Sequence, residues 1–243
     1  MMLTGEVHKF LFSMLMLGWS NFLYCFVGFR SSTQPTRSAI AMSLIIRLLG
    51  YKIYDGILDK ITDINEQLKQ IGLSTYNFCP DRLPDDIVLP WLNISFSDIN
   101  LLKNVFLELE ANPDWTPESD SLFIGERIFF LSLAKEIFTE KQSHLLWHHN
   151  YFGCYVPIDF KDVLLPDDFL TSMGSSIQLK DELTELADKL KLDLGNYTPD
   201  FELLYEQRIY ELENDPLGFE KMLLLCLYNF CLASIKYNLI IEF

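Results

Sequence analysis

The chain has 243 residues, 49% apolar and 22% charged, with a formal net charge of −15. This apolar content excludes a disordered chain, because disorder requires too little apolar surface to offset the entropy lost on folding. The negative charge repels phosphate backbones and no basic run is present, so the sequence argues against direct binding of nucleic acid.

Residues 1–41 form an apolar N-terminal segment. Within it, Phe10–Phe29 has no charge and is about as long as the ~20 residues that a helix needs to cross a bilayer. Three interpretations stay open: a misassigned start ahead of Met42, a membrane anchor followed by cytoplasmic arginines, and a signal peptide. We expect a single acidic globular domain over residues 42–243.

The location that we predict is the cytoplasm, since the five cysteines are scattered and form no C-x-x-C pair. The alternative is a single-pass membrane protein whose C-terminal domain lies in the cytoplasm. That alternative depends only on the apolar segment Phe10–Phe29.

The first half of the domain alternates between regular elements and loops. A strand is expected near residues 44–48, and apolar residues three and four apart predict a helix from Ile57 to Ile71 that ends at Gly72. The proline-rich stretch 74–95 is interpreted as a connecting loop. Helices should follow from Ser97 to just before Asn112 and over residues 121–138.

The second half begins with a predicted strand over residues 154–160. Ser175 and Gln178 form a capping box that predicts the start of a helix, and Pro199 and Pro216 mark the starts of two more. The last helix contains Met222–Ala233, which is apolar on every side and is therefore expected at the centre of the core. Residues 236–242 read as a terminal strand.

These elements predict an α+β fold, a mainly α-helical single domain with a small β-sheet. The alternative is an all-α fold.

Standard catalytic fingerprints are missing, so no catalytic residue and no cofactor are assigned. The candidates for a metal site are His144, His148, His149 and Asp159. On a helix, His144 and His148 would share a face, which is the spacing at which two imidazoles bind one metal ion, and a carboxylate could complete the site. The alternative is structural, because apolar neighbours favour hydrogen-bonded histidines in a half-buried wall.

A resemblance rests on this same region: His144 to His148, Gly153, the run Tyr155 to Phe160, and Gly174-Ser175-Ser176. This pattern resembles an uncharacterised bacterial protein family with the motif His-x-x-x-His, Gly-x-Tyr-Val-Pro-x-Asp-Phe and Gly-Ser-Ser. The resemblance implies a bacterial origin and a shared fold, and it implies no activity. Asn150 and Phe152 stand where that family is acidic, so a carboxylate-dependent reaction is not expected.

The function predicted from these observations is that of a non-catalytic acidic interaction protein of the immunity type, which binds a basic protein partner and no nucleic acid. One alternative is an enzyme or metal-binding protein that uses the histidine cluster. Another is a membrane-anchored accessory protein, with membrane contact only if residues 10–29 are a true anchor.

Overall fold

The computed structural model describes residues 43–49, 57–77, 89–117, 143–148, 153–165, 172–198 and 200–243. Six helices and five strands lie within these ranges, which confirms the predicted α+β class with a small sheet. In chain order the elements are β1 (Ser43–Leu49), α3 (Ile57–Gln70), β2 (Trp91–Ser95), α4 (Phe96–Ala111), α6 (His144–Trp147), β3 (Cys154–Val156), β4 (Met173–Ser175), α7 (Ser176–Lys189), α8 (Phe201–Leu212), α9 (Gly218–Tyr237) and β5 (Ile240–Glu242).

The five strands form one mixed sheet in the order β2-β1-β5-β3-β4. The pairs are antiparallel except β3 with β4, which are parallel. Because side chains alternate across a strand, Leu48 and Ile241 enter one hydrophobic core while Leu49 and Ile240 enter another. The sheet is therefore buried on both faces at its centre.

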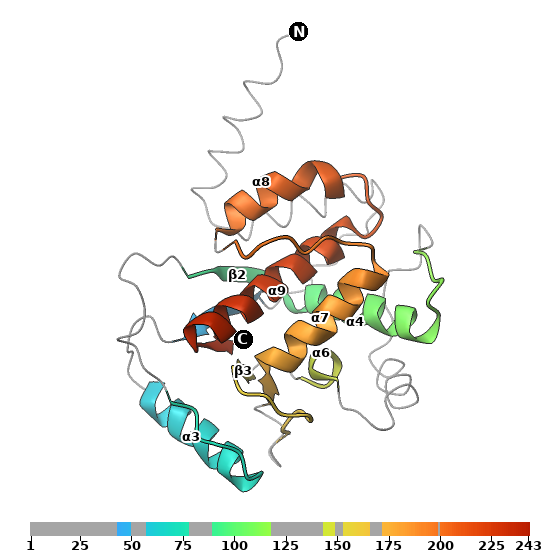
Figure 1. Ribbon diagram of the computed structural model, residues 1–243. Coiled ribbons are helices and arrows are strands. Elements are labelled where there is room, and N and C mark those ends of the chain that lie inside the picture. The colour runs from blue at the N-terminus through green and yellow to red at the C-terminus, as the bar shows by residue number, and fades with distance from the viewer. Residues whose placement is uncertain are drawn as a thin grey trace.

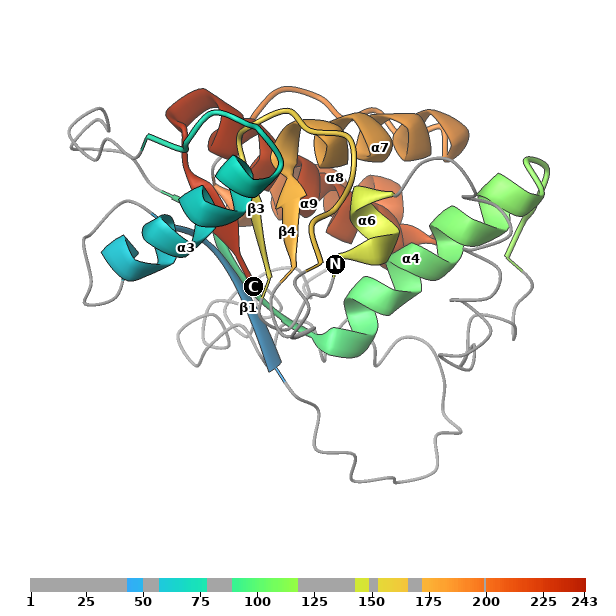
Figure 2. The ribbon, with the colours of Figure 1, turned by 90° about the horizontal axis from the view of Figure 1, so that it is seen from below.

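Helices cover the two faces unequally (Figures 1 and 2). The larger core unites β1, β2 and β5 with α4, α7, α8 and α9, and the smaller core places α3 against the opposite face. By length and composition α9 could span a membrane, but 67% of its apolar window is buried inside the protein. It contacts α4, α7, α8, β1 and β5, which confirms the prediction of a central core helix.

Local sequence signals set the helix ends. Gly72 has a positive φ of 74°, and the following residue, Leu73, donates its N–H to the Leu68 carbonyl at 2.9 Å, which ends α3 where the glycine predicted. The Ser175 hydroxyl accepts the Gln178 N–H at 3.2 Å and confirms the predicted cap of α7.

Three predictions about strands need correction. The strand predicted over residues 154–160 ends at Val156. Residues 74–95 do not form only a loop, because Trp91–Ser95 is a strand in which Leu92 and Ile94 are buried and Trp91 is exposed. Pro90 is tolerated there because it precedes the strand, which is the last in the described sheet order. The final strand, predicted over residues 236–242, begins only at Ile240, because α9 continues to Tyr237. The predicted helix over 121–138 lies outside the described residues.

Candidate functional site

The predicted histidine pair does not lie on one helical face. Helix α6 ends at Trp147, and His148 has extended backbone angles. His144 Nδ1 accepts the Ser175 N–H at 2.9 Å, so its proton is on Nε2, which lies 3.2 Å from the Lys161 carbonyl. His148 Nε2 lies 3.1 Å from the Cys154 carbonyl. Both rings are hydrogen-bonded parts of the interior, as the structural alternative expected.

The other two metal candidates are not brought into this interior. Asp159 is exposed, and one of its oxygens accepts the side-chain amide of Gln178 at 2.7 Å. His149 lies outside the described residues. Across the part of the chain that is described, no three His, Cys, Asp or Glu side chains are grouped to hold a metal ion. The metal site therefore stays a prediction.

Glu182 organises the interior around His144 and is itself only 3% exposed. Its carboxylate accepts hydrogen bonds from the Ser143 hydroxyl at 2.7 Å and from the backbone N–H groups of His144 and Leu145 at 2.8 and 2.9 Å. These N–H groups begin α6, where a negative charge is favourable. The Tyr155 hydroxyl donates to the His144 carbonyl at 2.8 Å. Ser143, His144, Tyr155, Ser175 and Glu182 are called the buried polar network below.

The described cysteines do not add a reactive group. Cys154, Cys226 and Cys231 are free and buried. Burial raises the pKa of Cys154 and that of Cys226 to about 12, so both remain protonated at neutral pH. A thiolate is the form that attacks or binds metal, so these side chains act as core residues.

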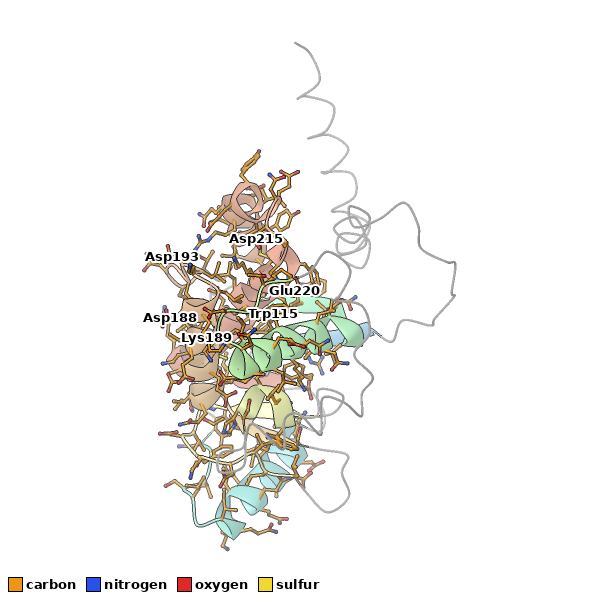
Figure 3. The ribbon with its side chains drawn as sticks, turned by 90° about the vertical axis from the view of Figure 1, so that its right-hand side faces the viewer. Trp115, Asp188, Lys189, Asp193, Asp215 and Glu220 are labelled. Atoms are coloured by element: carbon orange, nitrogen blue, oxygen red, sulfur yellow. The ribbon has the colours of Figure 1, made fainter. Side chains whose placement is uncertain are left out.

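Charged side chains are concentrated at the end of α7 that lies away from the buried polar network. Residues 185–221 contain ten carboxylates and four cationic side chains. They run from the last turns of α7 through α8 into the first turn of α9, and this part of the molecule is called the acidic end. Figure 3 shows Asp188, Asp193, Asp215 and Glu220 at this end, beside Trp115 from the segment after α4.

Most of the cationic side chains of the acidic end form ion pairs within the protein. Arg208 binds Glu211 at 2.7 Å and also donates to the Asp193 backbone carbonyl. Lys221 binds Asp215 at 2.5 Å.

Lys189 in turn binds Glu110 of α4. Four exposed carboxylates of the acidic end have no cationic partner among the described residues: Glu185, Asp188, Glu206 and Glu213. The surface is consequently anionic despite the nearby lysines and arginine.

Exposed carboxylates also form rows on two helices. Asp59, Asp63 and Glu66 follow one another along α3, and Asp181, Glu185 and Asp188 repeat the spacing on α7.

At a rise of about 1.5 Å per residue, successive charges in such a row are about 4.5–6 Å apart along the helix. A DNA strand also presents its charges in a row, one per about 3.4 Å of axis. Net charge alone does not reveal these rows, although the spacings of four and three residues are visible in the sequence.

One comparison with known proteins gives a match. A family model described as Putative DNA-mimic protein matches residues 40–243, more than four fifths of the chain. Searches of curated proteins and of solved structures give no match.

The match overturns the predicted function and the predicted partners. The immunity-type function is wrong, because the family description points to mimicry of DNA and so to the binding of DNA-binding proteins. A basic protein partner still fits that description. The prediction that nucleic acid plays no part conflicts with this description, which names DNA as the molecule that the family imitates. The match does not favour the enzyme, metal-binding or membrane-accessory alternatives.

Proposed function

Because the chain belongs to the family described as Putative DNA-mimic protein, we propose that it binds a DNA-binding protein at the site that otherwise holds DNA. The family match over residues 40–243 is the observation that carries the proposal. The acidic end and the carboxylate row of α7 support it, since a DNA mimic must present ordered negative charge.

The physical basis is the way proteins hold DNA. Half to two-thirds of protein–DNA hydrogen bonds go to phosphate and sugar, chiefly from arginine, lysine and polar side chains. A carboxylate offers the same cations two acceptor oxygens and can bind an arginine in a bidentate manner. Unpaired carboxylates such as Asp188 and Glu206 can therefore replace phosphates, and binding should weaken as salt increases, as DNA binding does.

Rigid presentation of the charges is the second requirement. The α7 row stands on a helix whose opposite face buries Leu183, Leu186 and Ala187 in the larger core. Side chains held on a packed helix lose less entropy on binding than side chains on a mobile loop. The row is thus pre-organised before a partner arrives.

The motif that resembles an uncharacterised bacterial family has a separate role in this proposal. Its residues include His144, Tyr155 and Gly174, which belong to or adjoin the buried polar network rather than the acidic end. We assign the motif to the scaffold that fixes α6 and α7. The bacterial origin and the cytoplasmic location stay predictions.

The proposal is tested by displacement from DNA. Proteins of the host extract are bound to immobilised duplex DNA, washed, and eluted at constant salt with this protein or with polyglutamate of equal total charge. We expect this protein to elute a DNA-binding protein that polyglutamate leaves on the column. Elution of nothing beyond the polyglutamate control would contradict the proposal.

A further inference from the structure

The outer face of α8 combines exposed apolar side chains with negative charge. Tyr210 is 81% exposed, and Leu203, two turns earlier, is 44% exposed. Glu206 lies between them on the same face, since residues three and four apart are neighbours on a helix. Glu213 extends this face, because its N–H donates to the Ile209 carbonyl at 2.8 Å and continues the helical turn. These four residues are called the α8 face.

This face has no partner within the described protein because α8 packs with its other side. Phe201, Leu204 and Leu212 are buried, and the Phe201 ring meets the ring of Phe230 in α9 edge to face at 5.2 Å. Helix α8 lies at the periphery of the described elements, beside α9 (Figure 1). Tyr210 is therefore not covered by any described element of the chain.

The α8 face contains no positively charged side chain. Arg208 is the only cationic residue of α8, and its side chain is 16% exposed. It points to the Asp193 backbone carbonyl and binds Glu211 at 2.7 Å. Apolar and anionic side chains therefore alternate along the α8 face, and none of its four residues is cationic.

Tyr210 belongs to the residue types that carry most of the binding energy at protein interfaces. Tyrosine is enriched among such residues, and an aromatic face attracts lysine and arginine side chains. DNA sites are rich in these cations, so charge complementarity selects the occupant.

Resting on the proposed function, we propose that the α8 face is the contact surface for the DNA-binding protein. Tyr210 receives a cationic side chain that otherwise holds DNA, and Glu206 and Glu213 bind its neighbours.

Helix α3 provides the matched control. Its Leu58 is 64% exposed beside Asp59, and the helix has the carboxylate row described above. It lacks an aromatic side chain, and leucine is under-represented among the residues that carry binding energy. If total acidity alone determined binding, substitutions on α3 and on α8 would have equal effects.

The experiment uses the protein eluted from the duplex DNA column, purified, with calorimetric measurement of its affinity for the full chain. We expect Tyr210→Ala to weaken binding about tenfold or more, and Leu58→Ala to change it less than about twofold. Tyr210→Phe should retain most of the affinity, because the ring is kept. Thermal unfolding of each variant checks that the fold is intact.

The outcomes separate the two proposals. A partner that is displaced by duplex DNA yet binds Tyr210→Ala and Leu203→Ala as tightly as the wild type would overturn the α8 face and leave DNA mimicry standing. A column from which nothing is eluted beyond the polyglutamate control would overturn DNA mimicry, and the α8 face with it.

Discussion

The buried polar network and the acidic end use similar residue types in opposite ways. In the network, Glu182 is 3% exposed and its carboxylate accepts three donated hydrogen bonds. At the acidic end, Glu206 and Glu213 are exposed and have no cationic partner among the described residues. One region has its polar groups satisfied internally, whereas the other keeps several exposed carboxylates available to another molecule.

The difference shows why residue type alone is a poor guide to function in this chain. Histidine, tyrosine and glutamate in one interior suggest chemistry, yet His144 is held by backbone groups on both ring nitrogens. A surface glutamate suggests only solubility, yet charges in a fixed geometry can bind a partner. The two regions should therefore respond differently to substitution, with large stability effects inside and small ones outside.

Removal of the Glu182 carboxylate should have the largest effect on stability. Glu182→Ala leaves the Ser143 hydroxyl and two N–H groups of α6 without their acceptor in the interior. We expect a loss of about 3–5 kcal/mol in the free energy of unfolding, since each unsatisfied buried group costs about 1–3 kcal/mol. Urea unfolding measures it. Glu185→Ala, on the exposed side of the same helix, is the control, and equal losses in the two variants would contradict the comparison.

Alkaline pH should have the next largest effect on the free energy of unfolding. Burial raises the pKa of the Cys154 and Cys226 thiols from 9.0 to about 12. The unfolded chain loses these protons at lower pH than the folded chain does. The free energy of unfolding is therefore unaffected by these thiols below pH 9 and decreases as the pH rises toward 12.

One pKa unit corresponds to about 1.4 kcal/mol, so each thiol should cost on the order of 1.4 kcal/mol by pH 10. Urea unfolding from pH 8 to 11 measures this slope. Cys226→Ala should reduce it, and an unchanged slope in that variant would remove the thiol from the explanation.

Gly174→Ala should have a smaller effect on the same region. An added Cβ would lie 2.4 and 2.5 Å from two carbons of the Tyr155 ring and 3.3 Å from His144 Nδ1. The ring cannot move away easily, because it is buried and its hydroxyl is hydrogen-bonded. We expect a loss of about 1–3 kcal/mol in thermal or urea unfolding. A variant as stable as the wild type would show that the network is loosely packed.

Neutralisation of the α8 face should change stability least. Glu206→Gln with Glu213→Gln should alter the free energy of unfolding by no more than about 0.5 kcal/mol, because both side chains are exposed. The same double variant should bind the eluted DNA-binding protein more weakly and with a lower salt dependence. Loss of stability comparable to that of Glu182→Ala would erase the distinction between the two regions.

Much of the fold could be predicted because its signals are local. The Ser175 cap, the stop at Gly72 and the all-apolar run of α9 each depend on neighbouring residues, and the structure confirms them. Strand β2 was missed because five residues after three prolines carry too short an alternation to identify. Strand β4 has only three residues and is recognisable only through its pairing with β3.

The site was harder to predict because it depends on relations between distant residues. Nothing local in the sequence indicates that Glu182 caps α6, which lies at least 37 residues earlier in the chain. Nor does a local signal indicate that Arg208 turns toward Asp193 and leaves the exposed face of α8 anionic. The net charge of −15 indicates that the surface charge is negative, but not how the charged side chains are arranged on it. The function proposed from the family match depends on that arrangement, so acidity alone led to the wrong function.

Mutual exclusion tests the central claim most directly. A complex of the eluted DNA-binding protein with a fluorescent duplex is titrated with this protein, and the anisotropy and the sedimentation of the duplex are followed. DNA mimicry predicts that the duplex is released free as a complex of the two proteins forms. A stable assembly that contains both proteins and the duplex would contradict it.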